Sequence, residues 1–246
     1  MELDITQLGD GPQRVVFVHG VLDRGRSFDR VADLLLHECT MEWYDRRGYG
    51  ASLEAEGVPV GVEGHMDDLL AVLDGRPAIV VGHSFGGVTV LGTAIRAPEL
   101  VHAVVLYETG MAWIPGWDDR FLKDVLWGED PEGDSVRLML RERFDTMTDE
   151  QQAAWLRNAR AFVEEERSVR LGTAPFDLRE LQAPLIWGTS ESYPFAAVSE
   201  HLEEAVGEVE IVFLHGAGHN AHRTDPEGFA DLVRRGIARA AARRRG

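Results

Sequence analysis

The sequence predicts an α/β protein built on a doubly wound, mostly parallel sheet with one helical insertion. Short β-rich runs alternate with amphipathic helices, which is typical of a parallel sheet covered on both faces. The alternation stops once, between about residues 110 and 181, where only helical patterns occur, and it then resumes. A chain of 246 residues is within the range of a single domain of this class.

Apolar runs and helical spacing place the individual elements. Strands are expected where the apolar run is short and unbroken, at Val15–Val18, Met41–Tyr44, Ala78–Val81, Val101–Tyr107, Pro184–Trp187 and Val209–Leu214. Helices are expected where apolar residues recur every three or four positions, at Ser27–His37, His65–Leu73, Gly86–Ala97, Phe195–Val206 and from Pro226 onward. Strand and helix therefore follow each other in the order that a βαβ architecture requires.

The inserted segment is expected to fold as helices only. Its helices are predicted at Phe121–Trp127, Ser135–Phe144 and Asp149–Glu166, with Thr148 as the N-cap of the last. Four of the six tryptophans lie in this segment, among other large apolar side chains. We assign residues 1–109 and 182–246 to the core and residues 110–181 to the insertion, within one structural domain.

Composition narrows the classes of function. The formal charge of −17 argues against a nucleic-acid partner, and the arginines near the C-terminus are interpreted as cations at a helix end. No run approaches the ~18 apolar residues of a membrane span, and Met1–Asp4 lacks the pattern of a signal peptide, so a cytoplasmic location without membrane contact is expected. The single cysteine, Cys39, excludes a disulfide framework and is expected in the core.

The segment Gly82-His83-Ser84-Phe85-Gly86 has the pattern of a nucleophile elbow. It follows the predicted strand Ala78–Val81 and precedes a predicted helix, which is the context that the strained serine backbone requires. We therefore expect Ser84 to be the nucleophile.

Two loops supply the other expected catalytic groups. An acyl-transfer site needs two backbone N–H groups for the oxyanion, and Phe85 and Val21, after His19-Gly20, are the candidates. His219, between glycine and asparagine in a loop after the last strand, is the expected general base, whereas His215 and His222 are interpreted as structural.

Four motifs together resemble the α/β-hydrolase family, in the order in which that family carries them. They are His19-Gly20, the turn Asp45–Ser52, Gly82–Gly87 and Gly218-His219. The resemblance implies an α/β-hydrolase fold, a structural role for the turn Asp45–Ser52, and an insertion that is a cap between the sixth and seventh strands of the usual numbering. Only Leu3–Leu8 precedes Val15, so the sheet is expected to lack one strand.

The resemblance also implies an acid that orients His219. Glu191, in the loop after the strand that follows the cap, is at the position where the family usually carries it. Glu108, at the end of the strand before the cap, is the alternative, since some relatives such as certain haloalkane dehalogenases carry their acid there. The resemblance favours Glu191 and leaves Glu108 open.

The function expected is hydrolysis of a carboxylic ester, lactone or related acyl compound through an acyl-enzyme. C–C bond hydrolysis, perhydrolase activity and ligand binding with little turnover are alternatives on the same residues. A small hydrophobic molecule is the expected substrate, with Met111, Trp113, Ile114 and Trp117 as candidate pocket residues. No cofactor or metal is expected, because the sequence has no H-E-x-x-H pattern, no cysteine pair and no G-x-G-x-x-G after the first strand. The sequence does not indicate an oligomeric state.

Overall fold

A computed structural model describes residues 3–53, 61–117, 120–171, 174–190 and 194–245. The described residues form one seven-stranded sheet with the strand order β1-β3-β2-β4-β5-β6-β7. Its strands are β1 (Ile5–Leu8), β2 (Gln13–Val18), β3 (Cys39–Tyr44), β4 (Ala78–His83), β5 (Val101–Tyr107), β6 (Leu185–Thr189) and β7 (Val209–Phe213). Every neighbouring pair is parallel except β1 and β3, which are antiparallel. This strand order confirms the predicted doubly wound sheet. Among the described residues one strand, β1, precedes β2, in line with the expectation of a missing strand.

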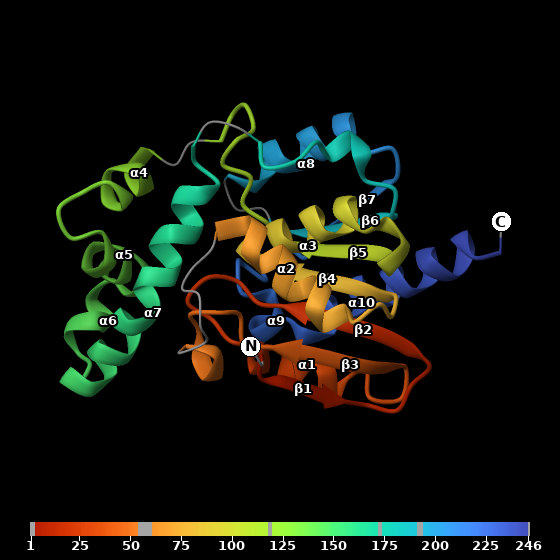
Figure 1. The fold of residues 1–246 in the computed structure, drawn as a ribbon, viewed down its shortest axis with the longest axis horizontal. Coiled ribbons are helices and arrows are strands. Elements are labelled where there is room, and N and C mark those ends of the chain that lie inside the picture. Colours follow the sequence, from red (N-terminus) through yellow and green to blue (C-terminus); the bar gives the residue numbers. More distant parts are fainter. Residues whose placement is uncertain (1–2, 54–60, 118–119, 172–173, 191–193, 246) are drawn as a thin grey trace.

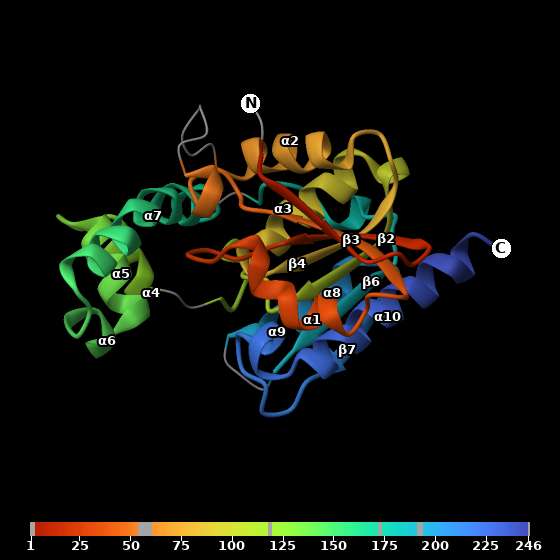
Figure 2. The same ribbon diagram turned by 90° about the horizontal axis from the view of Figure 1, so that it is seen from below.

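Helices cover both faces of the sheet (Figures 1 and 2). One core cluster joins the sheet to α2 (Gly61–Leu73), α3 (Phe85–Arg96) and α8 (Phe195–Ala205). The other joins it to α1 (Asp29–Asp33) and α10 (Pro226–Arg243), with the short helix α9 (Ala221–Thr224) beside them. Burial on both faces explains why the central strands are continuous apolar runs and do not alternate.

Four helices lie between β5 and β6 and form the cap. They are α4 (Arg120–Leu126), α5 (Pro131–Leu140), α6 (Glu142–Asp145) and α7 (Asp149–Ser168). In both ribbon views they stand together beside one end of the sheet, with α7 nearest to it (Figures 1 and 2). Thr148 caps α7 as predicted, in a capping box with Gln151.

Two predicted helices differ from those observed. The helix expected at Ser27–His37 has only five α-helical residues, because the chain turns through i→i+3 hydrogen bonds at Leu34 and Leu35 before it enters β3. The helix expected at Ser135–Phe144 is divided in two at Arg141, whose φ of 51° is incompatible with a continuous right-handed helix.

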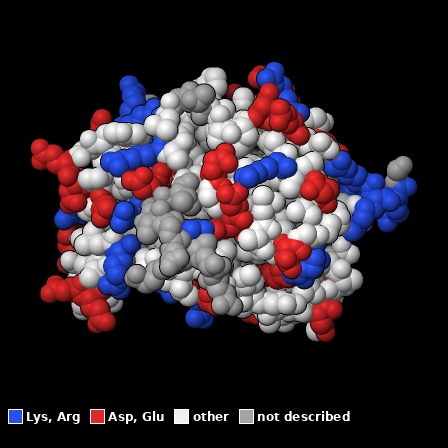
Figure 3. Space-filling model, viewed as in Figure 1, with Lys and Arg blue, Asp and Glu red and all other residues white. Residues whose placement is uncertain are grey.

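Charged side chains are spread over the visible face, and arginines gather at the free end of α10 (Figure 3). Earlier in this helix, Arg234 bonds to Glu38, and Arg235 and Arg239 both bond to Glu210. These pairs fit the interpretation of the arginines as solvated cations of a helix. None of the helices in the described ranges combines the length and apolarity needed to cross a bilayer.

Candidate active site

Ser84 lies in a strained turn between β4 and α3. Its φ of 52° and ψ of −127° are unusual for a residue with a side chain, and such backbones cost about 1–3 kcal/mol. The turn is tight because Gly86 passes close to β2: a Cβ there would lie 2.2 Å from the Val18 carbonyl oxygen. At Gly82 a Cβ would lie 2.5 Å from the Gly87 Cα. The elbow predicted from the sequence therefore has the backbone that this motif requires.

Two backbone N–H groups flank Ser84. Phe85 is the first residue of α3, so its N–H has no partner within the helix. Val21 follows His19-Gly20 in the loop after β2 and lines the same cavity as Ser84. The loop approaches the serine closely, since a Cβ on Gly20 would lie 3.0 Å from the Ser84 Cβ. Both residues expected to bind the oxyanion thus lie close to Ser84.

His219 reaches the site from the loop between β7 and α9. Its Nδ1 lies 2.9 Å from Glu108 Oε2, and because a carboxylate only accepts, Nδ1 carries the proton. In the neutral ring Nε2 is then the free base, and His219 and Ser84 line one cavity. The Phe195 ring stacks on the imidazole with centroids 5.5 Å apart, which fixes the plane of the ring.

The structure places Glu108, the alternative acid, in contact with His219. Glu108 follows β5 directly, is fully buried and has a φ of 42°. Its Oε1 accepts hydrogen bonds from the backbone N–H and hydroxyl of Ser190, the first residue after β6. Burial raises the pKa of Glu108, but the hydrogen bonds from His219 and Ser190 outweigh burial and lower it, so the carboxylate stays ionised. Glu191 lies outside the described residues.

His83 and Tyr107 hold the histidine loop, a role that the sequence analysis did not assign. The His83 Nε2 donates to the His219 carbonyl at 2.8 Å, and the Tyr107 hydroxyl donates to the Gly218 carbonyl at 2.8 Å. Burial, together with the neighbouring His222 and His219, holds the pKa of His83 well below its usual value, so the ring is neutral. His83 is the last residue of β4 and Tyr107 is the last residue of β5, and both strands flank the site. This position at a strand end is the feature of the sequence that could have identified them.

The cavity that Ser84 and His219 line has a volume of about 480 Å³ and lies between the core and the cap. Besides the residues already described, its lining includes Leu22, Trp117, Leu122, Met139, Leu140, Trp155 and the charged side chains Asp23, Arg143, Glu166, Arg170 and Arg223. The wall therefore combines apolar side chains with charged and polar groups.

Of the four residues predicted to face substrate, only Trp117 lines this cavity. Met111 is instead fully buried in the core. Trp113 and Ile114 line a second, larger cavity of about 670 Å³ beside α8, which has none of the predicted catalytic residues in its wall. After β5 the chain lines this cavity at Gly110, packs away from it at Met111, Trp113 and Ile114, and lines it again at Trp117.

The rival histidines have other surroundings. His215 is exposed and stacks on Phe213. His222 is fully buried, with its Nε2 3.4 Å from Asp23 Oδ2. Potential ligand atoms of Asp23, His83 and His222 lie within 4.8 Å of one another. Two ligands of one zinc ion lie at most about 4.2 Å apart, so these atoms fit one ion only if they draw closer.

Comparisons with known proteins show the family and the fold of the chain. The sequence profile of the Alpha/beta hydrolase family matches residues 15–232. Lipase LipV of Mycobacterium tuberculosis is 35% identical over 116 residues, which are 46% of this chain and 43% of the lipase. A pimeloyl-(acyl-carrier protein) methyl ester esterase of Chromobacterium violaceum is 35% identical over 127 residues, 52% of this chain and 45% of the esterase. These matches thus span less than half of either relative.

A solved structure shows the same fold over nearly the whole length. The thermophilic esterase of Thermogutta terrifontis superposes with a TM-score of 0.72, covering 97% of this chain and 93% of the esterase. The sequence identity is 17%, so this likeness concerns the fold alone.

Proposed function

Because the chain belongs to the alpha/beta hydrolase family, we propose that it is a serine hydrolase that cleaves carboxylic esters or lactones through an acyl-enzyme. The observation that carries the proposal is the hydrogen bond of 2.9 Å between His219 Nδ1 and Glu108, in the cavity that Ser84 also lines. This bond fixes the tautomer in which Nε2 is a base.

The reaction uses one proton carrier and one oxyanion site. Ser84 Oγ attacks the substrate carbonyl while His219 Nε2 accepts its proton, and the ionised Glu108 stabilises the imidazolium that forms. The N–H groups of Val21 and Phe85 bind the negative oxygen of the tetrahedral intermediate, each contributing about 3 kcal/mol. His219 then returns the proton to the departing alcohol, and water hydrolyses the acyl-enzyme by the same steps.

The cavity supports a substrate with an apolar group. Trp117, Leu122, Met139 and Trp155 provide an apolar wall beside Ser84, and such walls favour hydrophobic acyl or alcohol groups. The names of the lipase and the methyl ester esterase relatives agree with ester cleavage.

Labelling and turnover test the proposal together. A fluorophosphonate probe should label the wild type and leave Ser84→Ala unlabelled, and p-nitrophenyl butyrate turnover should fall by about 10⁶-fold in this variant. His219→Gln should lose activity similarly, whereas the matched control His215→Gln, in the same loop but not among the residues that line the cavity, should retain it.

The outcomes separate the alternatives. Labelling without ester or lactone turnover would overturn ester hydrolysis and favour C–C bond cleavage, perhydrolysis or ligand binding on the same residues. Equal labelling of the wild type and Ser84→Ala would exclude the serine mechanism.

A further inference from the structure

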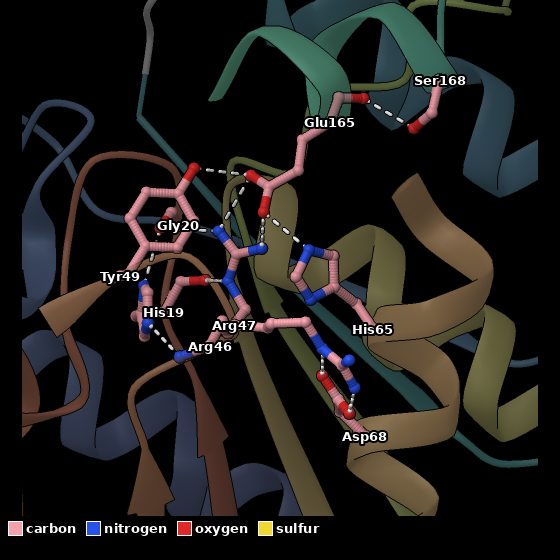
Figure 4. A network of polar contacts seen from close by, with 9 residues as sticks. All are labelled: His19, Gly20, Arg46, Arg47, Tyr49, His65, Asp68, Glu165 and Ser168. Carbon is pink, nitrogen blue, oxygen red and sulfur yellow. Dashed lines mark hydrogen bonds and ion pairs between the residues drawn. The ribbon is translucent and has the colours of Figure 1, made fainter. Parts of the chain in front are cut away.

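A fully buried network of charged and polar groups connects the cap to the loop that carries Val21 (Figure 4). At its centre is Arg46, from the turn after β3, whose guanidinium bonds to both carboxylate oxygens of Glu165 in α7, at 2.6 and 3.2 Å. His65 Nε2 lies 2.7 Å from the same carboxylate, and the Tyr49 hydroxyl donates to it at 2.8 Å. All four of these side chains are inaccessible to solvent.

Arg46 also holds two consecutive carbonyl groups in the loop after β2. Its Nε donates to the His19 carbonyl at 2.8 Å, and its Nη2 donates to the Gly20 carbonyl at 3.0 Å. Its guanidinium therefore bridges the carboxylate of a cap helix and the backbone of this loop, as the view in Figure 4 shows.

His19 fastens the same loop from a second direction. Its Nε2 accepts the Arg46 backbone N–H at 2.8 Å, so the proton of the neutral ring is on Nδ1, which lies 2.7 Å from the Gly20 carbonyl oxygen and donates to it. Burial and the charge of Arg46 lower the pKa of His19 to about 4, which keeps the ring in this neutral form. The Gly20 carbonyl thus accepts from two fixed donors.

The orientation of the Gly20 carbonyl determines the orientation of the Val21 N–H. The two groups belong to one planar trans peptide, in which C=O and N–H point in opposite directions. Two donors that hold the carbonyl on the network side therefore turn the N–H to the opposite side, and Val21 lines the cavity of Ser84. Arg46 also lies under the ring of Phe85, the other donor residue, at 5.1 Å.

We infer that Arg46 is a positioning residue that aims the Val21 N–H at the oxyanion, and that Glu165 of the cap holds Arg46 in place for this task. The inference rests on the proposed serine mechanism. A buried ion pair is weak evidence that Arg46 serves mainly to stabilise the fold. A purely stabilising arginine would also not need to donate to two successive carbonyls of the loop that precedes an oxyanion donor.

The first test compares the same substitution at neighbouring positions. Arg46→Lys keeps the charge beside Glu165 but loses the planar fork that reaches two carbonyls and a carboxylate together. The control is Arg47→Lys, because Arg47 forms its ion pair with Asp68 of α2. For p-nitrophenyl butyrate, Arg46→Lys should lower kcat by about 10²-fold, as for an impaired oxyanion donor, with little change in KM. The control should leave both constants near those of the wild type.

A transition-state analogue supplies a readout that a purely structural role would not change. The adduct of an alkyl trifluoromethyl ketone with Ser84 carries its oxyanion where the intermediate does, so its Ki should rise in Arg46→Lys by the same factor as kcat/KM falls. An unchanged Ki, or a loss expressed only in KM, would overturn the inference.

A double variant covers the case in which Arg46→Lys does not fold. Arg46→Met combined with Glu165→Met removes both buried charges, and such replacements often preserve folding. We expect this double variant to be folded, as judged by a cooperative thermal unfolding transition, and to be labelled by the fluorophosphonate. Its kcat should nevertheless be about 10²-fold below that of the wild type. Wild-type kcat in this folded protein would overturn the inference and leave the serine mechanism intact. Absence of turnover in the wild type would instead contradict the proposed function.

Discussion

Acidification should destabilise the protein at pH values at which its carboxylates are still ionised. His19 is the main cause for which the loss of stability can be calculated. This side chain is fully buried, and burial followed by the charge of Arg46 lowers its pKa from 6.5 to about 4. Between these two values the unfolded chain binds a proton that the native protein does not bind. Native stability therefore rises with pH through this window; it is complete above about pH 6.5 and lost as the pH falls toward 4.

The magnitude follows from the two pKa values. The difference between 6.5 and about 4, at about 1.4 kcal/mol for each pKa unit, corresponds to about 3 kcal/mol, of which about 2 kcal/mol is lost by pH 5. The pKa values of His83 and His222 are also lowered by burial, so these residues act in the same direction. The loss is a large part of the 5–15 kcal/mol typical of a folded domain.

Urea unfolding between pH 7.5 and 5.0 measures this effect. The free energy of unfolding should fall with a slope that reports uptake of at least one proton, and the histidine Cε1–H resonance of His19 should not titrate in that range. His19→Gln should reduce the slope by about one proton. Equal free energies of unfolding at pH 7.5 and 5.0 would refute the reasoning.

Three further predictions concern the catalytic acid, the elbow and the thiol. Glu108→Gln should reduce ester turnover by about 10⁴-fold, as for a triad Asp-to-Asn change, while Glu191→Gln should have little effect; the reverse result in steady-state kinetics would return the role to Glu191. Gly86→Ala should destabilise the protein by about 1–3 kcal/mol in urea unfolding, since its Cβ would meet the Val18 carbonyl oxygen at 2.2 Å; wild-type stability would contradict the tight turn. Burial raises the pKa of Cys39 to about 11, so a disulfide reagent should react with it only as fast as the protein unfolds, and immediate labelling of native protein would contradict this.

The parts of the site that the sequence predicted are local in the chain. The elbow around Ser84 follows from glycine spacing between a strand and a helix, and the histidine loop follows from a glycine after the last strand. The paired strands also contained the signal for Glu108: His83 lies opposite Tyr107 in the parallel β4–β5 ladder, so the next residue of each strand, Ser84 and Glu108, leaves the sheet at the same edge.

The features that the sequence did not predict depend on contacts between distant segments. Arg46 and Glu165 are 119 positions apart and meet only because α7 packs against the core. The turn Asp45–Ser52 was expected to have a structural role. Asp45 fits this expectation, since its carboxylate accepts hydrogen bonds from the backbone N–H groups of Gly25 and Ala51. Arg46, the second residue of this turn, donates to the carbonyls of His19 and Gly20 in the loop after β2. No spacing or hydropathy pattern predicts this contact, because it depends on tertiary packing.

The position of Glu108 at the end of a central strand has a consequence for how this scaffold can change. The proposed nucleophile and acid, Ser84 and Glu108, follow adjacent strands, whose spacing of about 4.8 Å is a constant of β-structure. With Glu108 as the proposed acid, the mechanism requires no carboxylate from the stretch beyond Ser190. Insertions, deletions or recombination in that stretch can alter which molecules enter the cavity while the geometry of the chemical step is inherited unchanged.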